Sequence, residues 1–215
     1  MHTSLSKLTL ASLAATALAS AAGASTIFDT GTPDGGFFGF IGYDVFDGQS
    51  VAVAFTPDHA CTLDDIGVWM MSNDFDNPGR TFTLSLQTDS LNGANPAAPS
   101  GTVLETWDMA TAAVGWNPVL DVANSVLHPL LSAGTTYWVV AESTEQGGAD
   151  PVWVWGSTFD GVYSGNIDFF SSPDWQTGET FGSAPGVVIN ATDVPAPASL
   201  ALLGIAGFVG RRRRR

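Results

Sequence analysis

The sequence has few cations, and almost all of them lie at its two ends. Seven Lys and Arg stand against 21 Asp and Glu among 215 residues. Lys7 lies near the start and a run of arginines at the finish, so Arg80 is the only cation in residues 25–193. All 21 acids also fall there, which gives that region a formal net charge of −20. A nucleic-acid partner is disfavoured, because phosphate contacts need Lys and Arg.

Cysteine and catalytic motifs are also scarce. Cys61 is the only cysteine, so no disulfide can form within the chain and stability must come from an apolar core. It precedes a strand-like run, where we expect a buried thiol. Gly-x-Ser-x-Gly, His-Glu-x-x-His and Gly-rich phosphate loops are all missing. A non-catalytic protein is expected. A secreted glycan hydrolase is a remote alternative, because no carboxylate pair can be singled out among 21 acids.

Residues 1–24 have the layout of a secretory signal peptide. A short segment with one cation, Lys7, is followed by an apolar stretch rich in Leu and Ala over residues 8–22. Ala22 and Ala24 then supply the small-x-small pattern of a signal peptidase site. Cleavage is predicted after Ala24. The alternative is an amphipathic helix of the core.

Residues 194–215 form a tail in three parts. A stiff spacer comes first, then an uncharged apolar stretch over residues 199–210, then a basic cluster. The spacer is Val194, Pro195, Ala196 and Pro197, and the cluster is Arg211, Arg212, Arg213, Arg214 and Arg215. The apolar stretch is shorter than the ~20 residues of a comfortable transmembrane helix, but snorkelling arginines and local thinning could cover the deficit. A packed terminal helix is the alternative, although it would place the arginines poorly.

This tail resembles the PEP-CTERM protein-sorting signal, whose pattern is Pro-Glu-Pro, an apolar transmembrane segment and an arginine-rich end. Ala196 stands where that pattern has Glu. The resemblance implies export, recognition by an exosortase and removal of the tail near the Pro-x-Pro motif. Signal peptidase and an exosortase-type enzyme are therefore the expected processing partners. The chain is expected at the cell envelope or outside the cell, held in the membrane by its C-terminal helix before processing.

Between these ends, the pattern is that of short strands separated by turns. Phe82, Leu84 and Leu86 alternate with polar residues over 80–87, which is the period of a half-buried strand. Further strands are expected over residues 37–43, 51–55, 62–71, 102–107, 135–142, 151–156, 162–170 and 186–192. The prediction is an all-β domain over residues 25–193. We expect an antiparallel two-sheet β-sandwich, jelly-roll-like, flanked by the signal peptide and a short C-terminal transmembrane helix.

Residues 82–155 are also similar to the choice-of-anchor ectodomains that accompany this kind of tail. The strongest part is residues 130–140, with an apolar pair, a Gly turn and a Tyr-Trp strand. The resemblance implies a fold and a location, and it names no ligand.

Tryptophan is plentiful, and the seven Trp all lie in the predicted domain. Trp116 and Trp175 have polar or glycine neighbours, so we expect them to be exposed and able to stack on sugars. Trp153 and Trp155 are two residues apart, share one face of a strand and are expected to fill the core. A carbohydrate-binding module that takes a polysaccharide is therefore the alternative function.

Oxygen-bearing residues concentrate at 72–79, where Asn73, Asp74, Asp76 and Asn77 form a candidate calcium loop. The segment starts like an EF-hand, but Pro78 at the fifth position and Ser85 at the twelfth exclude that motif. A looser calcium site and a plain polar turn both remain open. The acidity of the whole domain also fits a salt-adapted or simply soluble surface. No other cofactor is expected.

Overall fold

The described part of the chain is built from β-strands alone. The computed structural model describes residues 23–35, 41–77, 79–90, 98–112, 114–157, 167–170, 175–177 and 184–194. Within these ranges no segment is helical. The strands are β1 (Ala24–Asp29), β2 (Gly42–Asp44), β3 (Val51–Phe55), β4 (Cys61–Ser72), β5 (Thr81–Asp89), β6 (Pro99–Ala110), β7 (Val119–Asn124), β8 (Leu130–Leu131), β9 (Tyr137–Glu142), β10 (Pro151–Val154), β11 (Ile167–Phe170), β12 (Trp175–Thr177) and β13 (Val187–Asp193).

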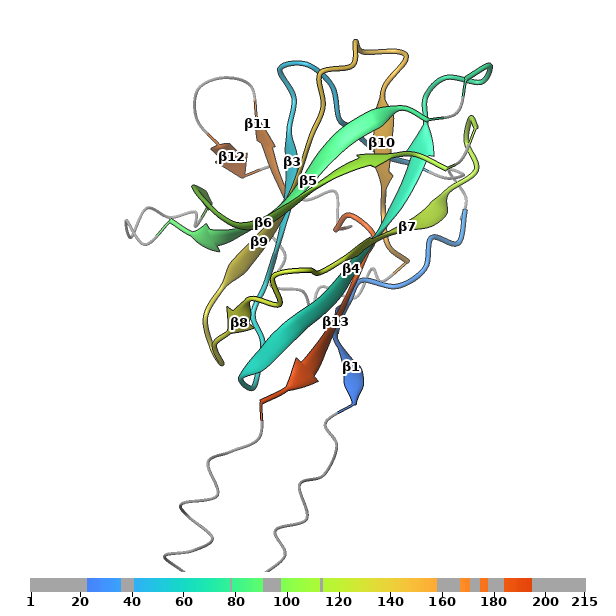
Figure 1. Cartoon of the computed structure of the whole chain (residues 1–215). Helices are drawn as coiled ribbons and strands as arrows, with labels where there is room; N and C mark the ends of the chain where they lie inside the picture. Colours follow the sequence, from blue (N-terminus) through green and yellow to red (C-terminus); the bar gives the residue numbers. More distant parts are fainter. Residues whose placement is uncertain are drawn as a thin grey trace, which may run out of the picture.

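These strands form two antiparallel sheets. The first has the order β1-β13-β4-β10-β2, with β7 and β8 paired to the other edge of β4. The second has the order β12-β11-β3-β9-β5-β6. Figure 1 shows the two sheets facing each other, so the described domain has the two-sheet arrangement that the sequence predicts.

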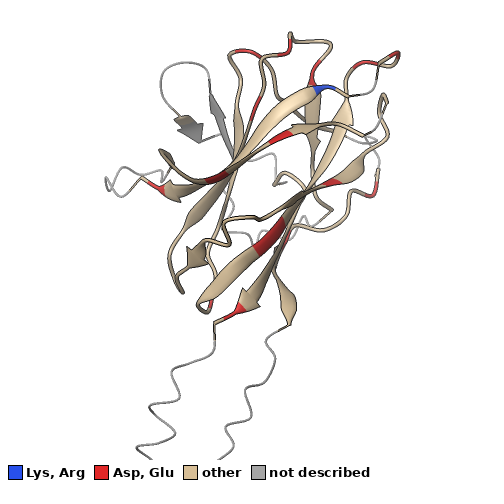
Figure 2. Cartoon of the chain, in the orientation of Figure 1, with Lys and Arg blue, Asp and Glu red and all other residues tan. Residues whose placement is uncertain are grey.

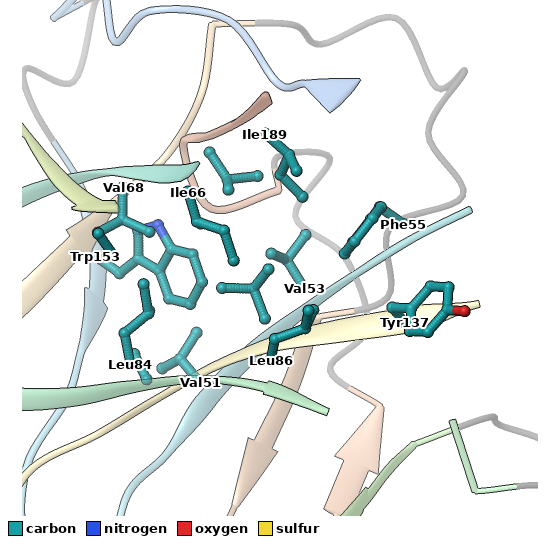
Figure 3. Close-up of a cluster of buried hydrophobic side chains, with 14 of the residues drawn as sticks. Val51, Val53, Phe55, Ile66, Val68, Leu84, Leu86, Tyr137, Trp153 and Ile189 are labelled. Atoms are coloured by element: carbon teal, nitrogen blue, oxygen red, sulfur yellow. The ribbon is translucent and has the colours of Figure 1, made fainter. Parts of the chain in front are cut away.

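The space between the sheets is filled with apolar side chains. Every second residue of β3, β5 and β9 points inward, and β4, β10 and β13 supply the facing layer. Figure 3 shows the centre of this layer, with labels on Val51, Val53, Phe55, Ile66, Val68, Leu84, Leu86, Tyr137, Trp153 and Ile189. Trp153 is fully buried, and its indole N–H donates to the carbonyl of Gly186 at 2.9 Å. Cys61 is a free, buried thiol, as expected.

The long strand β4 contains a β-bulge that keeps both of its halves facing the core. Cys61 and Leu63 point inward, and so do Ile66, Val68 and Met70. Strict alternation would have turned the second set outward. The register against β13 shifts here, because Ala191 pairs with Leu63 and Asn190 with Asp65, which leaves Asp64 as the extra residue.

The outer face of the second sheet is itself partly covered. Ala52, Ala54, Trp138 and Val140 form a second buried cluster, against which Trp175 of β12 packs. Ser85 and Gln87 lie on this face too. Both are buried, and Gln87 donates to the Ser85 hydroxyl at 3.0 Å. The prediction for β5 is therefore correct for its apolar face. Its polar face is less exposed than half-burial implies, because of this second layer.

Both chain ends leave the domain at the same end of the sandwich. Ala24 of β1 pairs with Thr192 of β13, and the two strands lie side by side at the lower end in Figure 1. The loops after β2, β4, β6 and β9 lie at the opposite end, since those four strands run away from the chain ends. In the ranges that the structure describes, no helix has the length and apolar character to cross a membrane.

Most of the expected strands are present. Those predicted over 51–55, 62–71, 80–87, 102–107, 135–142, 151–156 and 186–192 correspond to β3, β4, β5, β6, β9, β10 and β13. The strands predicted over 37–43 and 162–170 lie partly outside the described residues. The sequence did not predict β1, β7, β8 or β12. The signal peptide and the C-terminal helix also lie outside the described residues, apart from Gly23, Ala24 and Val194.

Gly42 gives a direct test of the pairing between β2 and β10. A Cβ at this position would lie 2.2 Å from the carbonyl oxygen of Trp153, which is backbone and cannot turn aside. Gly42→Ala should therefore lower the free energy of unfolding by about 1–3 kcal/mol, as overpacking does. Urea denaturation measures it. In the control Gly147→Ala, the added carbon would be 3.8 Å from the Phe46 ring, an ordinary contact. Equal stability of the two variants would contradict the close packing of β2.

Candidate functional site

A groove of about 770 Å³ opens at the loop end of the second sheet, opposite the chain ends. Its floor is a polar row across four neighbouring chain segments, formed by Ser50, Glu142, Thr83 and Asp108. Thr83 pairs with Glu142 on one side and with Asp108 on the other. Directly paired residues point to the same face, and Phe82 and Leu84 point into the core. The row therefore lies on the outer face.

The groove is rich in hydroxyl and carboxylate groups and has one aromatic wall. The Ser50 hydroxyl donates to Glu142 at 3.5 Å, and the Thr83 hydroxyl donates to Asp108 at 3.4 Å. Phe46, at the turn before β3, also lines the groove. Long contacts of this kind leave carboxylate lone pairs for a ligand. The arrangement suits a neutral, hydroxyl-rich ligand. An anionic ligand would be repelled by the carboxylates, with no cation among the lining residues to offset them.

Arg80, the only Lys or Arg among the described residues, joins two loops beside this groove. Its guanidinium contacts Asp74 of the loop after β4 and donates to Glu145, of the loop after β9, at 3.4 Å. Glu145 also accepts from the Thr81 amide at 3.1 Å and from the Thr81 hydroxyl at 2.9 Å. Figure 2 shows the single basic position at the start of β5, beside acidic loops. Removal of Arg80 would leave like charges of the two loops facing each other.

The same contacts keep the two carboxylates ionised. The Asn77 amide, the Asp76 backbone amide and Arg80 hold the pKa of Asp74 far below its usual range. The backbone and hydroxyl groups of Thr81, with Arg80, lower the pKa of Glu145. Both carboxylates therefore contribute stability above the ordinary pKa of their side chains, and that contribution is lost only in acid.

The calcium loop at Asn73, Asp74, Asp76 and Asn77 stays a prediction. The Asp76 backbone amide donates to one Asp74 oxygen at 2.9 Å. The Asn77 side-chain amide and the Arg80 guanidinium both contact the other Asp74 oxygen. A cation bound to Asp74 would have to displace a guanidinium. The four residues do form one tight turn, but its central carboxylate is already neutralised from within the chain. In the described ranges, no group of three or more His, Cys, Asp or Glu side chains is arranged to hold a metal.

The two tryptophans predicted to stack on sugars differ in position. Trp116 is exposed, as expected, and packs against the exposed ring of Phe75 with centroids 6.1 Å apart. Trp175 lies on β12 rather than in a loop and packs against the buried cluster on the second sheet. The two do not share a site. Trp153 is in the core and Trp155 packs against it, as predicted.

The predicted processing residues flank the paired ends of the domain. Ala24 is the first residue of β1, and the Val194 amide donates to the Ala60 carbonyl at 3.0 Å. Ala22, Pro195, Ala196, Pro197 and the cluster from Arg211 to Arg215 lie outside the described residues.

A loop at the chain-end side displays two apolar side chains. Val126 is 79% exposed and Leu127 67% exposed. Their amides donate to buried Glu105 at 2.6 and 3.1 Å, and Ser125 donates at 2.6 Å. Burial alone would raise the pKa of Glu105, but these three hydrogen bonds together lower it. Sequence reasoning missed this arrangement, because Glu105 lies in β6, about 20 residues before the loop that it holds.

Comparison with known proteins returns no match: neither a family model nor a curated protein matches this chain.

Asp121 provides a test of the electrostatics of the sandwich. The side chain is on the inward face of β7, one of its oxygens has no hydrogen-bond partner among the described residues, and burial raises its pKa to about 6. The native state then holds the proton more tightly than the unfolded chain, so this carboxyl lowers the free energy of unfolding as pH rises from about 4 to about 6.

Asp121→Asn should remove this pH-dependent fall in the free energy of unfolding. The variant should gain about 1–2 kcal/mol over the wild type between pH 4 and pH 7, after allowance for solvent screening. Urea denaturation across this pH range measures the difference. Asp76→Asn, at an exposed position, is the matched control and should show no such change. A pH-independent difference for Asp121→Asn would show that the carboxyl is not buried in the folded protein.

Proposed function

We propose that this chain is an exported, non-catalytic protein of the cell surface or extracellular matrix. In this proposal an exosortase-type enzyme sorts and processes it, and it associates with the envelope or exopolysaccharide. The observation that carries the proposal is the pair of sequence ends, a signal peptide at residues 1–24 and a PEP-CTERM-like tail at 194–215. We also propose that the strands of the domain are connected as in a jelly roll and that the domain is similar to choice-of-anchor ectodomains. In the same proposal, the two ends are a signal peptide and a short transmembrane helix.

The geometry of the described domain supports it. Ala24 and Thr192 are paired neighbours, so both proposed cleavage points adjoin the same end of the sandwich. A membrane anchor attached there leaves the groove and the loops around Arg80 at the end that faces away from the bilayer. A domain without disulfides and with a net charge of −20 also suits a soluble surface outside the membrane.

The arginine cluster tests the sorting proposal. Replacement of residues 211–215 by Gln should release or mislocalise the protein, because the cluster no longer holds the tail on the cytoplasmic side. Replacement by Lys keeps the charge and is the matched control. Cell fractionation and mass spectrometry of the C-terminus give the readouts. Ala196→Glu, which restores the Pro-Glu-Pro pattern, should increase tail removal. Unchanged localisation of the Gln variant would refute the sorting role.

A second candidate function, carbohydrate binding, is favoured by the groove. Its row of hydroxyls and carboxylates beside Phe46 provides the hydrogen-bonding groups and the apolar surface that a sugar ring uses. The groove lies at the end away from the proposed anchor, where a polysaccharide could reach it. Trp116 is the competing site, because it is exposed in a different loop.

Co-sedimentation of the full-length protein with the producing cell's own exopolysaccharide separates these two sites. Phe46→Ala should weaken binding about 2–10-fold, since an aromatic contact contributes about 0.5–1.5 kcal/mol. Glu142→Gln should weaken it as well, by removing a charged acceptor. Trp116→Ala should leave binding unchanged. The opposite pattern would move the site to Trp116, and no binding by the wild type would leave a structural role at the surface.

A further inference from the structure

Asp150 is a carboxylate that the fold buries without fully satisfying it. The side chain has no exposed surface, and its Oδ2 has no hydrogen-bond partner among the described residues. The other oxygen, Oδ1, accepts from the Gly148 amide at 2.5 Å. A buried ionised oxygen without a partner is costly. Either the carboxyl keeps its proton or a cation completes its surroundings.

The strand register brings two further oxygen-bearing side chains to the same place. Asp44 of β2 and Met71 of β4 both pair with Val152 of β10, on its two sides. The Asn73 backbone N–H donates to the Asp150 carbonyl at 2.9 Å, which continues the ladder one step beyond the pair of Pro151 and Ser72. With a side-chain period of two, Asp44, Asn73 and Asp150 project from one face of the first sheet.

The spacing suits a divalent cation. Diagonal neighbours across a strand pair lie about 7–8 Å apart, and two Asp side chains can bridge this span through a metal with oxygen distances of about 2.3–2.6 Å. The electrostatics agree with the geometry. Burial, and then the charge of Asp150, raise the pKa of Asp44, and burial raises that of Asp150 although the Asn73 side chain opposes the rise. Arg80, the only Lys or Arg among the described residues, contacts Asp74 and Glu145 instead.

We propose that the carboxylates of Asp44 and Asp150 form a binding site for a hard divalent cation, Ca²⁺ first among them. Two carboxylates, completed by water, are ligands that Ca²⁺ accepts. The Asn73 side chain is hydrogen-bonded to Asp150 and orients that carboxylate. The site links the loop after β9 to the hairpin of residues 45–50, between β2 and β3. The two segments are already in contact, because the Asp47 backbone amide donates to the Glu145 carbonyl at 2.8 Å. That hairpin and loop form one wall of the groove. The proposal does not depend on sorting or on sugar binding.

Calorimetry and thermal unfolding of the purified full-length chain, with CaCl₂ or with EDTA, test the site. Ca²⁺ should bind one to one. At about 100 times its Kd it should raise the unfolding midpoint by about 5–10 °C. Asp150→Asn and Asp44→Asn should each weaken binding at least tenfold. In EDTA, the Asp150→Asn variant should be as stable as the wild type or more stable, because the unsatisfied charge is gone. That result also separates lost binding from failure to fold.

Asp76→Asn is the matched control, because it makes the same change of charge in the other candidate loop and should bind Ca²⁺ as the wild type does. Loss of binding in Asp76→Asn, with binding kept in Asp150→Asn, would place the cation in the 72–79 loop and overturn the proposal. A wild type that is indifferent to Ca²⁺ would overturn it too, and would mean that Asp150 is buried in its protonated form.

Discussion

Burial of apolar side chains between two sheets is the interaction on which the described domain depends, because the alternatives are nearly absent. One cysteine allows no internal cross-link, and one cation within residues 25–193 allows few ion pairs. Val51, Leu84 and Trp153 are fully buried from three different strands, and burial at this density resists even small changes of volume. The inward faces are therefore committed to stability. Function must use the outward faces and the loops.

The loops and the chain ends give the molecule two chemically different ends. Ala24 and Val194 lie at one end, near a loop that displays Val126 and Leu127. The groove, the Arg80 contacts and the pair Asp44 and Asp150 lie at the other. These loop contacts come from segments far apart in the sequence, and they meet because the antiparallel strands return to the same end. A ligand bound in the groove and a cation bound at Asp150 would therefore act on one connected set of loops, away from any anchor.

Local patterns in the sequence predicted most of the strands and their buried faces, because both depend on the alternation of neighbouring residues. The alternation of Phe82, Leu84 and Leu86 predicted β5 and its buried face. β4 was predicted as a strand, but its bulge was not, although the paired acids Asp64 and Asp65 interrupt the apolar period and could have indicated it. Burial of Gln87 depends on a second apolar layer that no local pattern contains. The groove was beyond prediction for the same reason, since Thr83, Glu142 and Asp108 become neighbours only through strand register. The calcium loop around Asp74 stays a prediction, and the contact of Asp74 with Arg80 was not foreseen from the sequence.

The position of β13 has a mechanical consequence. This strand runs toward the end where the chain leaves the domain, and it is hydrogen-bonded along its length to β1 on one side and to β4 on the other. A pull on the chain beyond Asp193 is directed along the strand axis, so it stretches both ladders in shear instead of opening them one bond at a time. The force is shared by many backbone hydrogen bonds at once. A domain held by this end would resist the drag of flowing water or of a moving polymer better than one held through an edge hairpin.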